Sequence, residues 1–203
     1  MERHDVAVIG GGLAGWAAAA TAARAGSTVV VVDRDGVGGR AATDRVGRFL
    51  FNRGAHALYD RGPGAAVLRS LGIEPRGGRP PVRGWHARGA FVVHVMRYLR
   101  SDETSSPDRG RRALEEHLGL AGVAPETIAE ARYLHRMTVT SSMPVPENGG
   151  MAGRPSITST GDDRILVAGD WIGPEGNLAD ASLTSGAAAG HLAARRASPT
   201  VAS

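Results

Sequence analysis

Residues 5–33 read DVAVIGGGLAGWAAAATAARAGSTVVVVD, and this stretch decides the fold. The β-branched start over 5–9 predicts a buried parallel strand that ends on a glycine cluster. The alanine-rich run 13–25 predicts a helix that stops at Gly26, and 28–32 predicts a second buried strand. A strand, a glycine turn, a helix and a strand in this order predict a βαβ unit with a right-handed crossover.

The glycine turn of this unit carries a nucleotide-binding pattern. It reads Gly10-Gly11-Gly12-Leu13-Ala14-Gly15, a G-x-G-x-x-G that follows a predicted strand and opens a helix. The pattern serves a tight turn, a close approach of the backbone to a pyrophosphate, and close packing of helix on strand. Asp33 follows Gly15 by 18 residues, a spacing that suits a ribose hydroxyl and disfavours the 2′-phosphate of NADP. The predicted cofactor-binding residues here are Gly10, Gly12, Leu13, Ala14, Gly15, Asp33 and Arg34.

Two further segments extend the predicted site. Gly38-Gly39-Arg40 follows the second strand and adds backbone donors and a cation near the expected pyrophosphate. At the other end of the chain, 164–168 predicts a buried strand that leads into Gly169-Asp170, and 179–196 predicts a final helix. A carboxylate at a strand end can accept hydrogen bonds from ribityl hydroxyls, and a helix N-terminus can stabilise the charge of a reduced flavin. These segments favour FAD over NAD and add Gly39, Arg40, Gly169, Asp170 and Leu178 to the cofactor-binding set.

Together these motifs resemble the FAD-binding ends of the amine oxidase, protoporphyrinogen oxidase and phytoene desaturase superfamily. The likeness covers 5–75 and 160–196, and its most distinctive stretches are 8–15 with Asp33, 38–43, 51–56, 167–170 and 185–190. It implies FAD as the cofactor and an oxidoreductase that removes a hydride equivalent from a hydrophobic or amine small molecule. It also implies that the segment through His56 passes beside the flavin.

Two features depart from that family. Its members generally hold a large substrate domain between the two FAD-binding segments, whereas about eighty to ninety residues lie between them here, scarcely one small domain. Many of its amine oxidases hold a water near the flavin through a lysine, and this chain has no lysine, which favours the desaturase-like branch. We therefore expect an α/β, Rossmann-like doubly wound FAD-binding domain formed by 1–75 and 160–203, with 76–159 as a small, reduced second lobe.

The middle of the chain is less regular. The connection 76–89 is rich in proline, glycine and arginine, which marks a boundary. The remaining patterns predict an extended piece at 48–51, a helix at 64–71, a strand at 91–99, short helices at 112–118 and 125–134, and a strand at 136–142.

The shortened middle leaves two classes of function open. The first is an FAD-dependent oxidoreductase acting on a small molecule, in which an oligomer could supply the missing wall from a neighbouring subunit. The second is a catalytically silent relative that binds FAD or NAD and serves as a binding or partner protein, since an open cradle exposes a flavin to water and oxygen. The sequence nominates no general base, so the catalytic residues are unknown.

Composition excludes several other classes. The chain has 203 residues, a net charge of +4 and no cysteine, which excludes disulfides, cysteine-ligated zinc and cysteine nucleophiles. The histidines show no metal-ligand spacing, so no metal is expected. The arginines alternate with acidic residues rather than gathering, which argues against nucleic acid. The longest apolar runs are far shorter than a membrane span and no signal segment precedes the first strand, so we expect a cytoplasmic protein.

Overall fold

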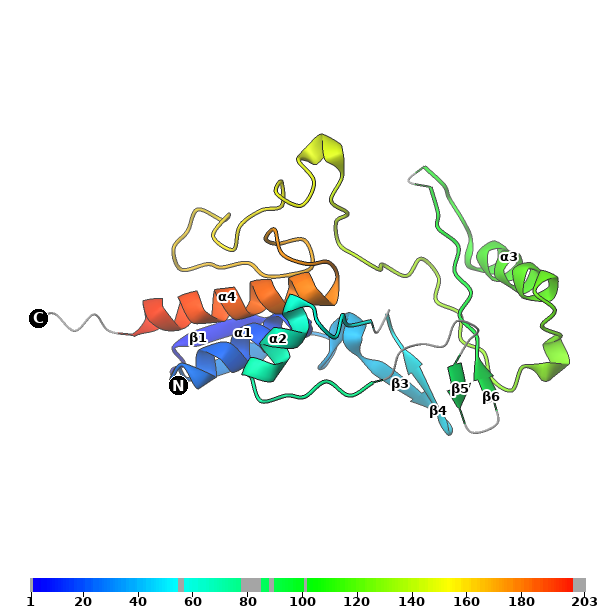
Figure 1. The fold of residues 1–203 in the computed structure, drawn as a ribbon, viewed down its shortest axis with the longest axis horizontal. Coiled ribbons are helices and arrows are strands. Elements are labelled where there is room, and N and C mark those ends of the chain that lie inside the picture. Colours follow the sequence, from blue (N-terminus) through cyan, green and yellow to red (C-terminus); the bar gives the residue numbers. More distant parts are fainter. Residues whose placement is uncertain (1, 55–56, 78–84, 88–89, 101, 199–203) are drawn as a thin grey trace, which may run out of the picture. The chain divides into compact units, whose positions relative to one another are not determined.

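The computed structural model describes residues 2–54, 57–77, 85–87, 90–100 and 102–198, and Figure 1 shows it as a ribbon. The chain divides into two compact units. One combines Met1–Pro75 with Thr138–Ser203, and the other is Arg76–Met137. The larger unit therefore takes in residues 138–159, which the sequence assigned to the second lobe.

The expected βαβ unit is present at the start of the larger unit. Strand β1 (Val6–Ile9) is followed by helix α1 (Leu13–Arg24) and strand β2 (Val29–Val32). The two strands pair in parallel, with Val6 opposite Val29 and Ile9 opposite Val32. Helix α1 ends where predicted, because Gly26 adopts a positive φ of 97° directly after the last turn.

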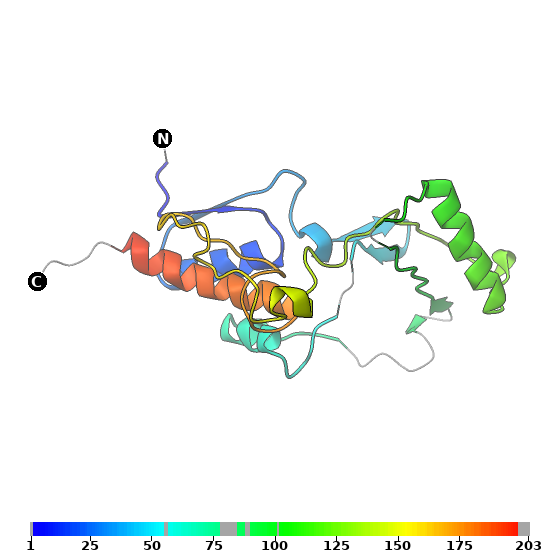
Figure 2. The ribbon, with the colours of Figure 1, turned by 90° about the horizontal axis from the view of Figure 1, so that it is seen from above.

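Helix α4 (Ala179–Ala197) packs along α1, and both views show the two helices side by side (Figures 1 and 2). Small residues make this contact close. A Cβ at Gly186 would overlap the carbonyl oxygen of Ala14, and a Cβ at Gly190 would overlap that of Ala18. Because residues four apart lie on one helix face, these glycines form a single seam with α1. No helix in the described part of the chain combines the length and apolar character needed to cross a membrane.

The remaining elements of the larger unit lie between its two ends in sequence. A short 3₁₀ turn, η1 (Gly39–Ala41), leads into an antiparallel hairpin of β3 (Thr43–Val46) and β4 (Phe49–Asn52). Helix α2 (Pro63–Ser70) packs on α4. Residues 146–148 form another 3₁₀ turn, η3 (Pro146–Asn148), in an otherwise irregular stretch.

A buried carboxylate connects α2 to α4. Asp180 lies in the first turn of α4, its residue is 3% exposed, and its Oδ1 accepts a hydrogen bond of 3.1 Å from the Gly64 amide. Gly62, the N-cap residue of α2, supplies no side-chain cap, so Asp180 satisfies an amide of the first turn from a different helix. Burial raises the pKa of the Asp180 carboxyl above its ordinary value, and the bond from Gly64 offsets only part of this effect.

This raised pKa gives a testable pH dependence. A carboxyl whose pKa is higher in the folded chain stabilises the fold below its unfolded pKa and loses that contribution as the pH rises through the folded pKa. Asp180→Asn keeps an acceptor for Gly64 and removes the charge. We expect the free energy of unfolding to rise by on the order of 1 kcal/mol at neutral pH and to change little near pH 4. Thermal unfolding of both proteins across this range checks the prediction, and an equal loss of stability at every pH would contradict it.

The smaller unit, Arg76–Met137, contains one hairpin and one helix. The hairpin pairs β5 (Trp85–Ala87) with β6 (Ala90–Val92), and the helix is α3 (Pro107–Leu120). Ser106 caps α3 by accepting a hydrogen bond from the Arg109 amide, and Pro107 occupies the first helical position. This cap starts the helix earlier than the predicted 112–118. A 3₁₀ turn, η2 (Pro125–Thr127), follows α3.

Several expectations for the irregular regions were wrong. The predicted helix 125–134 is only the turn η2, because Ile128 is already extended. The predicted strand 91–99 ends at Val92, and 136–142 is not a strand. The predicted strand 164–168 is irregular, since the Ile165 amide closes a turn onto Asp162 and the Val167 amide bonds to Ile157.

The loss of that strand changes the sheet. Among the described residues β1 pairs with β2 alone, so the parallel sheet has two strands rather than the several of a doubly wound fold. The strands are accordingly less buried than predicted. Ile9 is 91% exposed and its partner Val32 is 54% exposed. The described fold is therefore one βαβ unit closed by a C-terminal helix.

Candidate functional site

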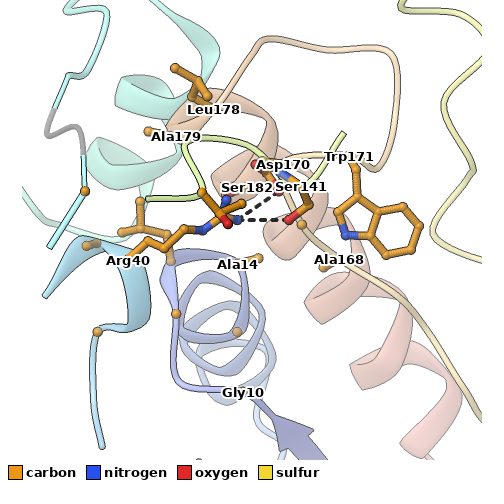
Figure 3. Close-up of a pocket in the computed structure, with 18 of the residues that line it drawn as sticks. Gly10, Ala14, Arg40, Ser141, Ala168, Asp170, Trp171, Leu178, Ala179 and Ser182 are labelled. Atoms are coloured by element: carbon orange, nitrogen blue, oxygen red, sulfur yellow. Dashed lines mark hydrogen bonds and ion pairs between the residues drawn. The ribbon is translucent and has the colours of Figure 1, made fainter. Parts of the chain in front are cut away.

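A cleft of about 280 Å³ lies in the larger unit where the glycine turn faces the start of α4. Its walls come from the turn Ile9–Gly15, from η1 and from residues 138–141. They are completed by residues 168–171 and by the first turn of α4 with Leu178. Figure 3 shows Arg40 reaching across this cleft toward Asp170 and Ser141. Segments from both ends of the chain thus form one site.

The glycine turn is fixed by backbone bonds to both neighbouring segments. Gly10 has a φ of 106° and donates its amide to Val32 at 2.8 Å, and the Gly38 amide donates to the Gly11 carbonyl at 2.7 Å. A Cβ at Gly15 would overlap the Gly10 carbonyl oxygen, so only glycine allows α1 to start this close to the turn. The first turn of α1 contains no acidic residue and no side chain caps it, so its first amides can serve as donors to an anion.

Asp33 is tied to this turn at the end of β2. Its Oδ2 accepts a hydrogen bond of 2.6 Å from the Gly11 amide, and its Oδ1 accepts one of 2.8 Å from the Asp35 amide. The bond from Gly11, followed by that from Asp35, lowers the pKa of the Asp33 carboxyl. The carboxylate is thus ionised at neutral pH and exposed beside the turn, outside the cleft lining.

Arg40 and Asp170 form the electrostatic centre of the cleft. Arg40 Nη2 lies 3.1 Å from Asp170 Oδ1, and the Asp170 side chain is only 4% exposed. Burial alone would raise the pKa of Asp170, but hydrogen bonds from the Ser141 amide, Arg40 and Thr140 outweigh it and lower the pKa. Asp170 therefore remains a buried carboxylate at neutral pH. Its contribution to stability is present above the unfolded pKa and is lost as the pH falls through the folded pKa.

Helix α4 positions Asp170 through a hydrogen bond to the residue that precedes it. The buried hydroxyl of Ser185 accepts a hydrogen bond of 3.0 Å from the Gly169 amide and donates one of 2.6 Å to Ala181. This bond anchors the residue that precedes Asp170 to the helix. Trp171, on the other side of Asp170, lines the cleft while its indole points away from Arg40 (Figure 3).

The N-cap of α4 is backbone-strained. Leu178 has φ 52° and ψ −114°, a conformation that costs a non-glycine residue about 1–3 kcal/mol. Arg154 holds the preceding loop, because its Nη1 donates to the Gly176 carbonyl at 2.8 Å and its Nη2 donates to Asn177 Oδ1 at 2.9 Å. The strain falls at a residue that lines the cleft, which is where strain is usually associated with ligand binding.

The structure brings together most of the residues that the sequence nominated. Those in the cleft lining are Gly10, Gly12, Leu13, Ala14, Gly15, Arg40, Gly169, Asp170 and Leu178. Asp33, Arg34 and Gly39 lie outside it. Arg34 instead pairs with Asp35 at 2.7 Å on the surface, and Gly39 stands behind Gly12, so that a Cβ there would lie 3.5 Å from the Gly12 Cα. His56 lies outside the described residues.

Sequence reasoning missed the wall formed by residues 138–141. Thr138, Val139 and Ser141 line the cleft, and the bonds of Arg40 to Val139 and Ser141 fix this wall. Nothing local in the sequence marks these residues, because Arg40 precedes them by about a hundred positions and Asp170 follows Ser141 by 29. No cluster of three or more His, Cys, Asp or Glu side chains that could hold a metal occurs in the described ranges.

Comparison with known proteins agrees with this geometry at the N-terminal end. Residues 8–71 match the family model of the NAD(P)-binding Rossmann-like domain, which spans β1, α1, β2, the β3–β4 hairpin and α2. The match covers less than half of the 203 residues. No match to a curated protein or to a solved structure was found. Residues 8–71 are thus similar to an NAD(P)-binding Rossmann-like domain.

Proposed function

We infer that this protein is an FAD-dependent oxidoreductase of the desaturase or amine-oxidase type, acting on a hydrophobic or amine small molecule. The observation that carries this inference is the cleft in which the glycine turn faces Asp170 across Arg40. When bound, the flavin would accept a hydride equivalent from a C–H bond of the substrate, while the protein supplies position and electrostatics. The resemblance of both chain ends to FAD-binding segments supports the same assignment.

The residues of the cleft fit a dinucleotide. The amides of Gly12 and the first turn of α1 offer donors to a diphosphate, and Arg40 offers a cation next to them. A volume of about 280 Å³ lies just below the range of roughly 300–1,000 Å³ that is typical of ligand pockets. It suits the central diphosphate and the adjoining sugar, and the adenosine end would extend along the surface toward Asp33.

Asp170 and α4 favour FAD over NAD. Asp33 suits the adenosine ribose of either dinucleotide, so it does not discriminate between them. Asp170 is a buried carboxylate beside the diphosphate position, which suits the ribityl hydroxyls of a flavin. The N-terminus of α4 at Leu178 provides the positive end of a helix dipole for the ring.

Thermal unfolding with each dinucleotide tests the assignment. A ligand that binds only the folded chain stabilises it by an amount that grows with the logarithm of its concentration divided by its dissociation constant, so at equal concentrations FAD should give the larger shift of the midpoint. A larger shift with NAD would overturn FAD as the cofactor. A shift with neither would contradict dinucleotide binding altogether.

A catalytically silent, FAD-binding relative is the second candidate, and one observation favours it. Within the described lining of the cleft the only ionisable side chains are Arg40 and Asp170, and they are paired with each other. Neither is free to act as a general acid or base. Photoreduction of the bound flavin followed by a screen of amine and hydrophobic substrates separates the candidates. Reduction by any such substrate supports the oxidoreductase, and reoxidation by air without reduction by any of them supports the silent relative.

A further inference from the structure

We propose that the Arg40–Asp170 ion pair is a specificity lock, which admits ligands that carry hydroxyls beyond a diphosphate and disfavours ligands that end at the diphosphate. The proposal rests on the proposed function, because it concerns the same cleft. It adds a reason why the site would prefer a full dinucleotide to ADP, which shares the adenosine and diphosphate groups.

The first support is that the protein already occupies three of the five N–H groups of Arg40, including both on Nη2. Its Nη2 donates to Asp170 Oδ1 at 3.1 Å and to Ser141 Oγ at 3.1 Å, and its Nη1 donates to the Val139 carbonyl at 3.3 Å. Figure 3 shows the guanidinium held between Asp170 and Ser141. A phosphate that binds Nη2 of Arg40 must therefore compete with Asp170 and Ser141, which already accept from that nitrogen.

The second support is the unequal burial of the two partners. The Arg40 side chain is 43% exposed, whereas that of Asp170 is 4% exposed. Arg40 can move toward a phosphate and stay solvated, but Asp170 then keeps only the Ser141 amide, at 2.9 Å from Oδ2, and Thr140 as hydrogen-bond donors. A buried carboxylate that loses a charged partner is strongly destabilised. This penalty disfavours any ligand that binds Arg40 but donates no hydrogen bond to Asp170.

A ligand with hydroxyls beyond the diphosphate avoids the penalty. Its phosphates take Arg40, while its hydroxyls donate to the Asp170 oxygen that Arg40 has left. ADP ends at the phosphate and has no group to offer on that side. The ion pair thus disfavours ADP because ADP would leave the buried Asp170 carboxylate without a donor in place of Arg40. A site discriminates more strongly when the wrong ligand leaves its buried polar groups unpaired than when it only lacks an apolar contact.

Removing the charge of Asp170 should affect two ligands in opposite directions. In Asp170→Asn, Arg40 is free to bind phosphate, so we expect ADP to bind about three- to tenfold more tightly than to the wild-type chain. FAD loses its carboxylate partner and should bind about tenfold more weakly. Isothermal titration of the full chain with ADP and with FAD measures both constants. Asp162→Asn, which removes a partly exposed carboxylate paired with Arg164 outside the cleft lining, is the charge-matched control and should leave both constants unchanged.

Ser141→Ala provides a second, milder variant in case the first fails to fold. Ser141 is exposed, and its hydroxyl is one of the three acceptors of Arg40. Its loss removes one acceptor that competes with phosphate for Arg40 while Asp170 stays intact, so ADP binding should tighten about twofold. The lock is overturned if ADP binds neither variant more tightly than the wild-type chain. Absence of FAD binding to the wild-type chain would contradict the proposed function instead, and the ADP titrations would still decide the lock.

Discussion

Replacing Gly12 with alanine is expected to weaken FAD binding at least tenfold, roughly 1.4 kcal/mol, without loss of stability. Gly12 has φ −82° and ψ −175°, an extended conformation open to alanine, and no atom lies within 4 Å of a Cβ built there. The fold therefore tolerates the methyl group. Because Gly12 lines the cleft, the same methyl group would hold a diphosphate away from the amides at the start of α1.

Titration with FAD and thermal unfolding of the same preparation check this prediction. Gly15→Ala is the matched comparison, because its Cβ would overlap the Gly10 carbonyl oxygen and should lower both stability and affinity. Gly12→Ala is therefore expected to lower FAD affinity alone, whereas Gly15→Ala lowers affinity and stability together. If the Gly12→Ala variant binds FAD as tightly as the wild-type chain, the diphosphate does not approach this turn.

Replacing Gly186 with alanine is expected to lower the free energy of unfolding by about 1–3 kcal/mol. Its Cβ would overlap the Ala14 carbonyl oxygen and lie 2.9 Å from the Ala17 Cβ, both in α1. Helices α1 and α4 would have to separate, which disturbs a contact formed by small, buried residues on both sides. The midpoint of thermal unfolding should fall by several degrees, at roughly 2–4 °C per kcal/mol.

The control is a helical glycine with free space around it. Gly119 lies in α3 and no atom lies within 4 Å of a Cβ built there, so alanine should raise the stability of this helix by about 0.5–1 kcal/mol. The stability changes expected for Gly186→Ala and Gly119→Ala have opposite signs, which distinguishes a packing effect from an effect of helix propensity. An alanine at Gly186 that is as stable as the wild-type chain would mean that α4 does not lie against α1.

The parts of the fold that the sequence predicted are those with a local pattern. Hydrophobic periodicity and Gly26 define β1, α1 and β2, and the small-residue run after Ala179 defines α4. The same reasoning failed for 164–168. Its composition is that of a strand, but a strand also needs a neighbour, and its amides bond to turns instead. Whether a segment finds a neighbouring strand to pair with cannot be predicted from the sequence of that segment alone.

The residues of the candidate site likewise fall into those that carry a sequence motif and those that do not. The glycine turn, Arg40 and Asp170 carry recognisable motifs, and the structure gathers them around one cleft. The wall at 138–141 has no motif, because it bonds to Arg40 and Asp170 through the Val139 carbonyl, the Ser141 amide and an ordinary serine hydroxyl. Backbone groups are common to nearly every residue, so their use at a site leaves little mark on the sequence.

If the two ends of this chain form one flavin-binding cleft, the folded protein should retain FAD. The most direct measurement is the visible absorbance spectrum of the pure protein after incubation with excess FAD and desalting. We predict a flavin spectrum with about one FAD for each chain. A desalted protein without flavin absorbance would contradict the account.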